Sequence, residues 1–320
     1  MLVGTPGRDV IHARGGNDTV RGLGGNDVIC GGAGDDTIRG GSGKDLLRGG
    51  PSAFWQGVGA ERTESLYGGR GNDLLFGVGG DDDMHGGEGN DQLRGGEGNF
   101  DVLSGDAGDD ELHGGRAGDE LASYLAAPGP ITATLGDAEG VHDKEGYADG
   151  EGHDLLFGID YVEGSRFDDT ITTGGVYSGS FGGPGNDHLI GQEGSQELWG
   201  GPGDDVMDGG AGTDRAYYRA APVPVEVRLW QGVATGEGTD QLLNIEDIQG
   251  SVFDDILEGD AGPNLIIGED GDDTLSGREG DDVLTGGPGI DTYDGGPDFD
   301  HCSAVESETY QNCEEVSSPA

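Results

Sequence analysis

Positive charge is scarce in this sequence. Its 320 residues include 16 lysines and arginines against 64 aspartates and glutamates, so the formal net charge at pH 7 is −48. Nucleic-acid binding needs a basic surface, and an acidic membrane surface would repel a chain of the same charge. We therefore expect no nucleic-acid partner, and cations are the natural ligands.

Long apolar segments are also missing. No stretch reaches the about 20 apolar residues that a membrane-spanning helix needs, so we predict no membrane span. The first residues, MLVGTPGRDVIH, lack the basic and apolar regions of a secretory signal peptide. We therefore expect either that the true start lies upstream or that export uses another route.

Catalytic signatures are missing as well. The sequence contains neither HExxH nor GxSxG. The stretch GSGKD at 41–45 has the wrong spacing for a phosphate loop and lacks a Ser or Thr after the lysine. Carboxylate pairs, as in DDDMH at 81–85, are unavoidable in so acidic a chain. We expect no catalytic residues and no enzymatic activity.

Aromatic and sulfur-containing residues are few. We expect Trp55, Trp199 and Trp230 to pack against the fold, with a sugar-binding platform as the alternative. Cys302 and Cys313 are close enough in sequence to close a small loop, and we predict a disulfide between them. This pairing implies an oxidising compartment and leaves Cys30 as an unpaired thiol.

Glycine, by contrast, is abundant and recurs with a period of nine. Residues 22–48 read GLGGNDVIC, GGAGDDTIR and GGSGKDLLR without a slip. The unit is G-G-x-G-x-D-x-U-x, where U is a large apolar residue. It fills four blocks, at 4–50, 68–121, 164–218 and 250–303. A fixed period predicts stacked structural repeats, and the alternative is a disordered glycine- and aspartate-rich chain.

The unit resembles the calcium-binding nonapeptide repeats of the bacterial RTX (hemolysin-type) family. This resemblance implies an all-β fold, a right-handed parallel β-roll or β-helix solenoid, in which a three-residue strand follows each six-residue turn. It also implies multiple Ca²⁺ ions as cofactors. Two units form one coil in the family, so equivalent residues stack eighteen positions apart.

The aspartate at the sixth position of each unit is the predicted calcium ligand. Stacked carboxylates repel one another unless a cation lies between them, and Ca²⁺ accepts oxygen ligands that include backbone carbonyls. Zn²⁺ would favour nitrogen or sulfur ligands, which these turns do not supply. The predicted ligands are Asp9, Asp18, Asp27, Asp36, Asp45, Asp73, Asp82, Asp91, Asp110, Asp169, Asp187, Asp205, Asp214, Asp255, Asp273, Asp282, Asp291 and Asp300.

Alternation along each short strand assigns the remaining positions. The eighth position is predicted to point inward, and the ninth, which holds residues such as Arg39 and His85, to face solvent. The inward set comprises Ile29, Ile38, Leu47, Leu75, Leu93, Leu189, Leu275 and Leu284.

Some units depart from the pattern. The segment 51–67 is a degenerate repeat that retains Glu64 and Leu66, and Phe100 takes the ligand position with Asp101 displaced by one. Glutamine and asparagine replace the ligand at Gln196 and Asn264. We expect calcium to bind weakly, if at all, at these two positions.

Two longer interruptions, at 122–163 and 219–249, match one another, with Tyr124 corresponding to Tyr218. Alternation in ITATL and VEVRL predicts strands in them. We expect wider β-helix coils that cap or splice the adjoining rolls. A C-terminal tail, 304–320, carries the second cysteine of the predicted disulfide.

Three functions are consistent with these patterns. The leading hypothesis is a secreted, extracellular calcium-binding protein that folds on meeting Ca²⁺ and has a structural or interaction role. The alternatives are the C-terminal calcium-binding and secretion portion of a larger secreted enzyme (protease, lipase or polysaccharide-modifying) and an adhesin. An adhesive or ice-binding array would need a regular face of threonine, whereas the seventh and ninth positions are mixed.

Overall fold

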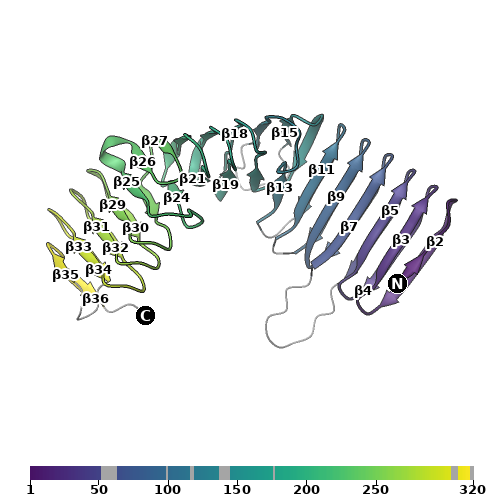
Figure 1. The fold of residues 1–320 in the computed structure, drawn as a ribbon, viewed down its shortest axis with the longest axis horizontal. Coiled ribbons are helices and arrows are strands. Elements are labelled where there is room, and N and C mark those ends of the chain that lie inside the picture. The colour runs from purple at the N-terminus through teal and green to yellow at the C-terminus, as the bar shows by residue number, and fades with distance from the viewer. Residues whose placement is uncertain are drawn as a thin grey trace. The chain divides into compact units, whose positions relative to one another are not determined.

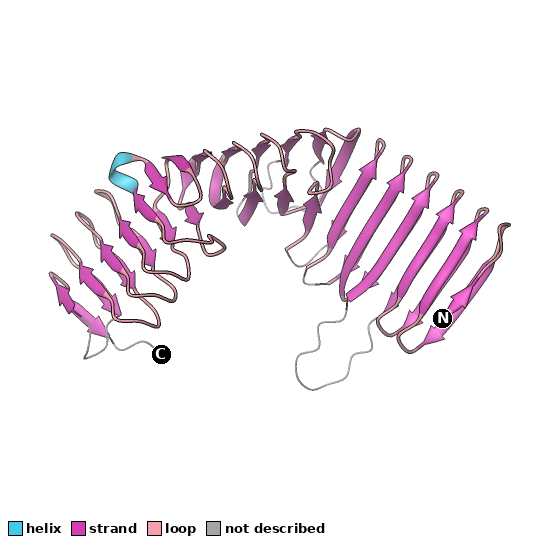
Figure 2. Cartoon of the chain, viewed as in Figure 1, coloured by secondary structure: helices cyan, strands magenta, loops and turns pink. Residues whose placement is uncertain are grey.

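The computed structural model describes residues 1–51, 63–98, 100–115, 119–136, 145–175, 177–303 and 309–317. It contains two compact units, Met1–Ser165 and Arg166–Ala320. Within each unit short parallel strands stack side by side as the coils of a β-solenoid (Figure 1). The predicted all-β, parallel repeat fold is confirmed. A single 3-10 turn, η1 (Leu229–Gln231), is the one helical element that the described residues form (Figure 2).

Unit 1 is built from two sheets. The first contains, in spatial order, β1 (Leu2–Val3), β3 (Thr19–Gly24), β5 (Thr37–Ser42), β7 (Thr63–Arg70), β9 (Asp81–Glu88), β11 (Val102–Ala107), β13 (Leu121–Ser123) and β17 (Tyr161–Glu163). The second contains β2 (Val10–Gly15), β4 (Val28–Ala33), β6 (Leu46–Pro51), β8 (Leu74–Gly79), β10 (Gln92–Glu97), β12 (Glu111–Gly115), β16 (His153–Phe157), β15 (Glu145–Asp149) and β14 (Thr132–Thr134).

Unit 2 has the same plan. Its first sheet contains β19 (Tyr177–Phe181), β21 (Glu193–Trp199), β24 (Arg215–Tyr217), β28 (Asp247–Gln249), β30 (Leu265–Ile267), β32 (Val283–Thr285), β34 (His301–Ser303) and β36 (Glu315–Ser317), with β23 (Ala211–Gly212) beside β21. Its second contains β18 (Thr170–Thr172), β20 (His188–Ile190), β22 (Val206–Asp208), β27 (Thr239–Leu243), β26 (Val233–Thr235), β25 (Glu226–Arg228), β29 (Ile256–Glu258), β31 (Thr274–Ser276), β33 (Thr292–Asp294) and β35 (Thr309–Gln311).

The strand register follows the eighteen-residue coil. Val28 lies between Val10 and Leu46, each eighteen positions away. The step lengthens where the pattern breaks, because Leu46 pairs with Leu74 across the degenerate segment. Residues 52–62 of that segment, Trp55 among them, lie outside the described residues.

Strand length differs between the units. Unit 2 has the expected three-residue strands in its regular coils, such as β31 and β32. The expectation is wrong for unit 1, where regular strands such as β4 and β5 are six residues long. There the pairing continues into the next turn, as in Leu23 with Gly41.

The core of each unit is a narrow column of apolar side chains that point from its two sheets into the interior of the solenoid. The eighth-position side chains that the sequence assigns inward are all buried, with 0–1% of their surface exposed. Arginines at the ninth position, such as Arg39 and Arg48, are exposed as predicted. Each coil therefore buries few large apolar side chains. Ordering its many glycines costs conformational entropy, so apolar burial alone is a weak source of stability.

The two interruptions lengthen the coil and contain antiparallel strands, since β13 pairs with β17 forty positions further on and β24 pairs with β28 thirty-two positions further on. In unit 1, β15 runs antiparallel to both β14 and β16. In unit 2, β26 runs antiparallel to both β25 and β27, after which β25 resumes parallel pairing with β29. ITATL and VEVRL contain β14 and β25, so strands form where alternation predicts them.

The C-terminal segment is more than a tail, because β35 and β36 add a further coil on β33 and β34. Cys302 and Cys313 are joined by a disulfide whose Cα atoms are 5.9 Å apart. Cys30 is a free, half-buried thiol.

Candidate metal centre

The sixth-position aspartates point into the solenoid, on the same side of each strand as the apolar eighth position. Nearly all the predicted ligands are buried, with 0–3% of their surface exposed. Asp9 and Asp18, in the first coils, are partly exposed instead. Burial of ionisable groups in rows requires specific partners for each oxygen.

In most of these carboxylates one oxygen has such a partner within the chain. The backbone N–H of Asp27 donates to Oδ1 of Asp45 at 2.7 Å, and that of Asp73 donates to Oδ1 of Asp91 at 2.6 Å. Unit 2 repeats this bond, for example from Asp273 to Asp291 at 2.9 Å. We call these rows of sixth-position carboxylates the carboxylate ladder.

The second oxygen is different. In most ladder members this outer oxygen is buried and has no hydrogen-bond partner. Those members among the predicted ligands are Asp27, Asp36, Asp45, Asp73, Asp82, Asp91, Asp110, Asp187, Asp205, Asp214, Asp273, Asp282 and Asp300. A buried anionic oxygen without a donor is costly, so the ladder needs a positively charged ligand.

The raised pKa values of the ladder carboxylates also favour the binding of a cation. Burial, together with the neighbouring Asp101, raises the pKa of Asp82 to about 8, and burial is also the main cause that raises the pKa of Asp110 to about 8. Burial raises the pKa of Asp273 to about 7, assisted by Asp255 and Asp291. In each case the environment disfavours the charged form as long as no cation is bound.

A glycine at the first position makes room beside each outer oxygen. A Cβ atom added to Gly22 would lie 2.3 Å from Oδ2 of Asp27 and 2.5 Å from the carbonyl oxygen of Gly40. The equivalent Cβ on Gly277 would lie 2.1 Å from Oδ2 of Asp282. The absence of a side chain therefore leaves a cradle lined by one carboxylate oxygen and one carbonyl oxygen.

This donor set fits Ca²⁺, which takes hard oxygen ligands and combines carboxylates with backbone carbonyls. Among the described residues no three His, Cys, Asp or Glu side chains gather into a metal-binding cluster. The carbonyl oxygens beside the carboxylates, such as that of Gly40 near Asp27, would supply further ligands. A bound Ca²⁺ would neutralise the ladder charge and bridge adjacent coils.

The ladder contains acids that the sequence pattern missed. Asp101, not Phe100, occupies the ladder position, since Asp101 is fully buried and accepts the N–H of Asp82 at 2.8 Å while Phe100 is exposed. Asp82 and Asp101 are nineteen residues apart instead of eighteen, so the turn between them contains the extra residue. Other additional ladder acids are Glu64, Glu120, Asp154, Asp240, Glu246 and Glu314.

A simpler signal would have found most of these acids: an Asp or Glu two residues before an inward apolar residue. Asp101 precedes Leu103 in this way, and Glu64 precedes Leu66. The outer oxygen is unpartnered in Asp101, and so is one oxygen of Glu64 and of Glu120. Burial and nearby Asp82 raise the pKa of Glu64 to about 9.

Replacing Asp101 by asparagine should lower the calcium stoichiometry by about one ion. The amide oxygen can still accept the N–H of Asp82, but the negative charge is lost. Asp109→Asn is the matched control, since fifth-position asparagine is native in other units, as at Asn26. Isothermal titration calorimetry would measure the stoichiometry. An unchanged count for Asp101→Asn, or an equal loss in both variants, would contradict the assignment.

At several ladder positions the protein itself supplies donors; the hydroxyl of Tyr293, for example, donates to Oδ2 of Asp291 at 3.3 Å. Asp255 accepts bonds from the backbone N–H of Ser251 at 2.6 Å and from its hydroxyl at 2.7 Å. The amide nitrogen of Asn264 donates to the carbonyl of Glu246 at 2.7 Å, and that of Gln196 donates to the carbonyl of Gly175 at 3.2 Å. Protein donors therefore occupy oxygens that calcium would otherwise use.

The fifth position has a separate role. Its Asn or Asp side chain accepts a backbone N–H from the following coil, as Asn26 does from Lys44 at 3.1 Å and Asp254 from Asp272 at 2.9 Å. The sixth position accepts from the preceding coil, so the two side chains bond in opposite directions along the stack. This pairing explains the recurring Asn-Asp and Asp-Asp sequences.

The outer faces carry aromatic stacks. Trp199 lies between Phe181 and Tyr217, with ring centroids 4.2 and 4.3 Å away. Because its two faces are covered by these neighbours, Trp199 packs as expected. Trp230 is 46% exposed, donates to Glu258 at 2.6 Å and lies beneath the Arg278 guanidinium.

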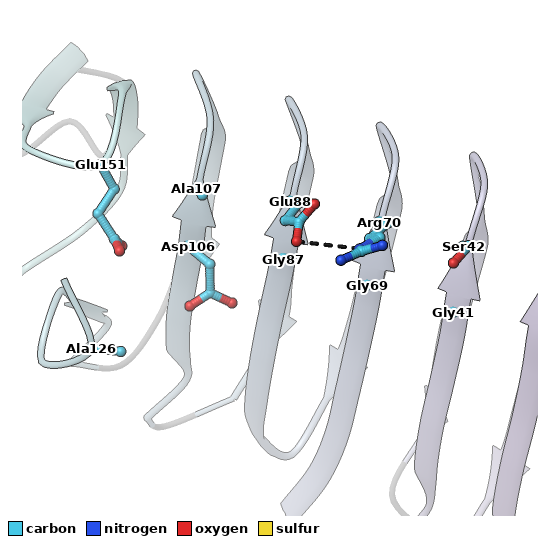
Figure 3. Close-up of a pocket in the computed structure, with 10 residues that line it drawn as sticks. All are labelled: Gly41, Ser42, Gly69, Arg70, Gly87, Glu88, Asp106, Ala107, Ala126 and Glu151. Carbon is cyan, nitrogen blue, oxygen red and sulfur yellow. Dashed lines mark hydrogen bonds and ion pairs between the residues drawn. The ribbon is translucent and has the colours of Figure 1, made fainter. Parts of the chain in front are cut away.

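A groove crosses the turns of unit 1 where third-position side chains of neighbouring coils meet (Figure 3). Arg70 and Glu88 form an exposed ion pair there at 3.2 Å. No histidine, cysteine or lysine is found among the described residues that line it. The groove is thus a feature of the repeat surface.

Comparison with protein families gives one match. The model of the RTX calcium-binding nonapeptide repeat (4 copies) matches residues 1–29, 21–52, 58–93, 85–121, 156–175, 181–216, 249–284 and 267–301. No curated protein matches the chain. None of the helices formed by the described residues is long and apolar enough to cross a membrane.

Proposed function

Because the chain belongs to the family of RTX calcium-binding nonapeptide repeat proteins, we propose that it works outside the cell. There it forms a non-enzymatic solenoid that folds on binding several Ca²⁺ ions and has a structural or interaction role. The carboxylate ladder, with its buried and unpartnered outer oxygens, is the observation that supports this proposal.

The high negative charge of the chain and its disulfide both favour an extracellular setting. Calcium sites in extracellular modules are typically weak, with Kd values of about 10⁻⁴–10⁻³ M. A chain with a formal charge of −48 would stay expanded while calcium is scarce, because its carboxylates repel one another. The disulfide between Cys302 and Cys313 also favours an oxidising compartment.

Fractionation of the organism that encodes the protein tests the setting. We expect immunoblots to detect the protein in the medium or at the cell surface when calcium is millimolar, because only there does the ladder receive enough Ca²⁺. A cytosolic protein serves as the control for lysis. Accumulation of the folded, disulfide-bonded protein in the cytosol would contradict the proposal.

A further inference from the structure

The two interruptions of the repeat, which we call insert 1 (122–163) and insert 2 (219–249), contain ladder members whose outer oxygen has a partner. In insert 1 the hydroxyl of Tyr124 donates to Oδ2 of Asp154 at 2.9 Å. In insert 2 the hydroxyl of Tyr218, the residue just before the insert, donates to Oδ2 of Asp240 at 3.0 Å. All four side chains are buried, with 1–2% of their surface exposed.

These two aspartates are otherwise ordinary ladder members. Oδ1 of Asp154 accepts the backbone N–H of Asp110 at 3.0 Å, and Oδ1 of Asp240 accepts that of Asp205 at 3.2 Å. This bond to Oδ1 is therefore the same one that regular coils make, as between Asp27 and Asp45. Only the partner of the outer oxygen differs, and in both inserts it is a tyrosine hydroxyl.

The backbone holds each tyrosine in the same way. Tyr124 receives a bond from the N–H of Ala127 at 2.9 Å, and Tyr218 receives one from Ala221 at 2.9 Å. The N–H of Tyr124 donates to the carbonyl of Glu163 at 2.9 Å. The same arrangement thus occurs independently in each unit.

Each insert also buries a small apolar cluster of its own. The antiparallel strands place Ala133 opposite Ala148 in unit 1 and Val227 opposite Ala234 in unit 2, and all four are at most 1% exposed. Three of the four antiparallel pairings among the described strands join strands only a few residues apart, as in Asp149 with His153 and Thr235 with Thr239, so they need little loop closure. The inserts thereby gain local stability that the regular coils lack.

We propose that the hydroxyls of Tyr124 and Tyr218 stand in for a cation, so that the two inserts fold without calcium and separate calcium-dependent stacks. This inference rests on the proposed calcium function of the ladder. A hydroxyl that donates to a carboxylate makes a strong, charge-assisted bond. It satisfies the buried oxygen in the apo chain, whereas most ladder carboxylates of the regular coils lack a donor on that oxygen and must wait for Ca²⁺.

Hydrogen exchange with mass spectrometry on the full chain tests the proposal. In EGTA at neutral pH, amides of β16 and β27 should exchange more slowly than those of β4 and β31, and in saturating Ca²⁺ all four strands should be protected. Tyr124→Phe with Tyr218→Phe should speed exchange of β16 and β27 in EGTA by about 10- to 100-fold. Tyr177→Phe is the control, because Tyr177 is 77% exposed.

Failure of this inference is distinguishable from failure of the calcium function. If β4 and β31 respond to calcium but β16 and β27 exchange equally fast in EGTA, the tyrosine role is overturned and the ladder function stands. If β4 and β31 are protected in EGTA and indifferent to Ca²⁺, the calcium function itself fails. The wild-type comparison needs no variant, so it decides the matter even if the double variant does not fold.

Discussion

Removal of calcium at neutral pH should convert the regular coils from β-structure to coil, and millimolar Ca²⁺ should restore them. Most of the buried outer oxygens of the ladder have no donors, and each coil buries few large apolar side chains. A ligand that binds only the folded state stabilises it by about 2.7 kcal/mol per site at a free concentration of 100 Kd. Many such sites along a stack make the effect large.

Far-UV circular dichroism during a calcium titration measures this transition, with Mg²⁺ as the control. Mg²⁺ demands near-octahedral geometry and gives up its water reluctantly, so turns made of carbonyls and carboxylates should respond to it weakly. A spectrum unchanged between chelator and calcium, or an equal response to Mg²⁺, would refute the assignment of the ladder as a calcium site.

Acidification should partly replace calcium in the metal-free chain. Burial, together with neighbouring carboxylates, raises the pKa of Asp205 to about 8 and that of Asp187 to about 7 in the folded state. In the unfolded chain these groups titrate near a pKa of about 3.9. At pH values between the unfolded and the folded pKa, the folded state binds more protons than the unfolded state. The free energy of unfolding therefore rises as the pH falls through this range.

The measurement is β-structure as a function of pH in metal-free buffer, from pH 8 down to pH 5, which stays above the isoelectric point of about 4.1. We expect β-structure to increase on acidification. With calcium near its midpoint concentration, the same scan should show weaker calcium binding at low pH, because protons and Ca²⁺ compete for the same oxygens. Loss of structure on acidification of the metal-free chain would contradict the pKa shifts.

Much of the site could be predicted from the sequence because the repeat is local. An aspartate two positions before an inward apolar residue must point to the same side of a strand, which places Asp27 beside Ile29 and Asp36 beside Ile38. The same rule extends to Asp101, where strict counting from the glycine pair fails. Counting misplaced this ligand because a turn can absorb one extra residue while the strand alternation persists.

The sequence by itself determined the coil, its period and the chemistry of its ligands, since each nine-residue unit carries its own turn, strand and carboxylate. Only the tertiary structure decided which carboxylate oxygens have partners. The bond from Asp110 to Asp154 spans 44 residues, and the one from Tyr124 to Asp154 spans 30. Such contacts depend on how an insert folds back onto the stack, and no local pattern encodes that distance. Which oxygens need calcium therefore follows from packing between coils.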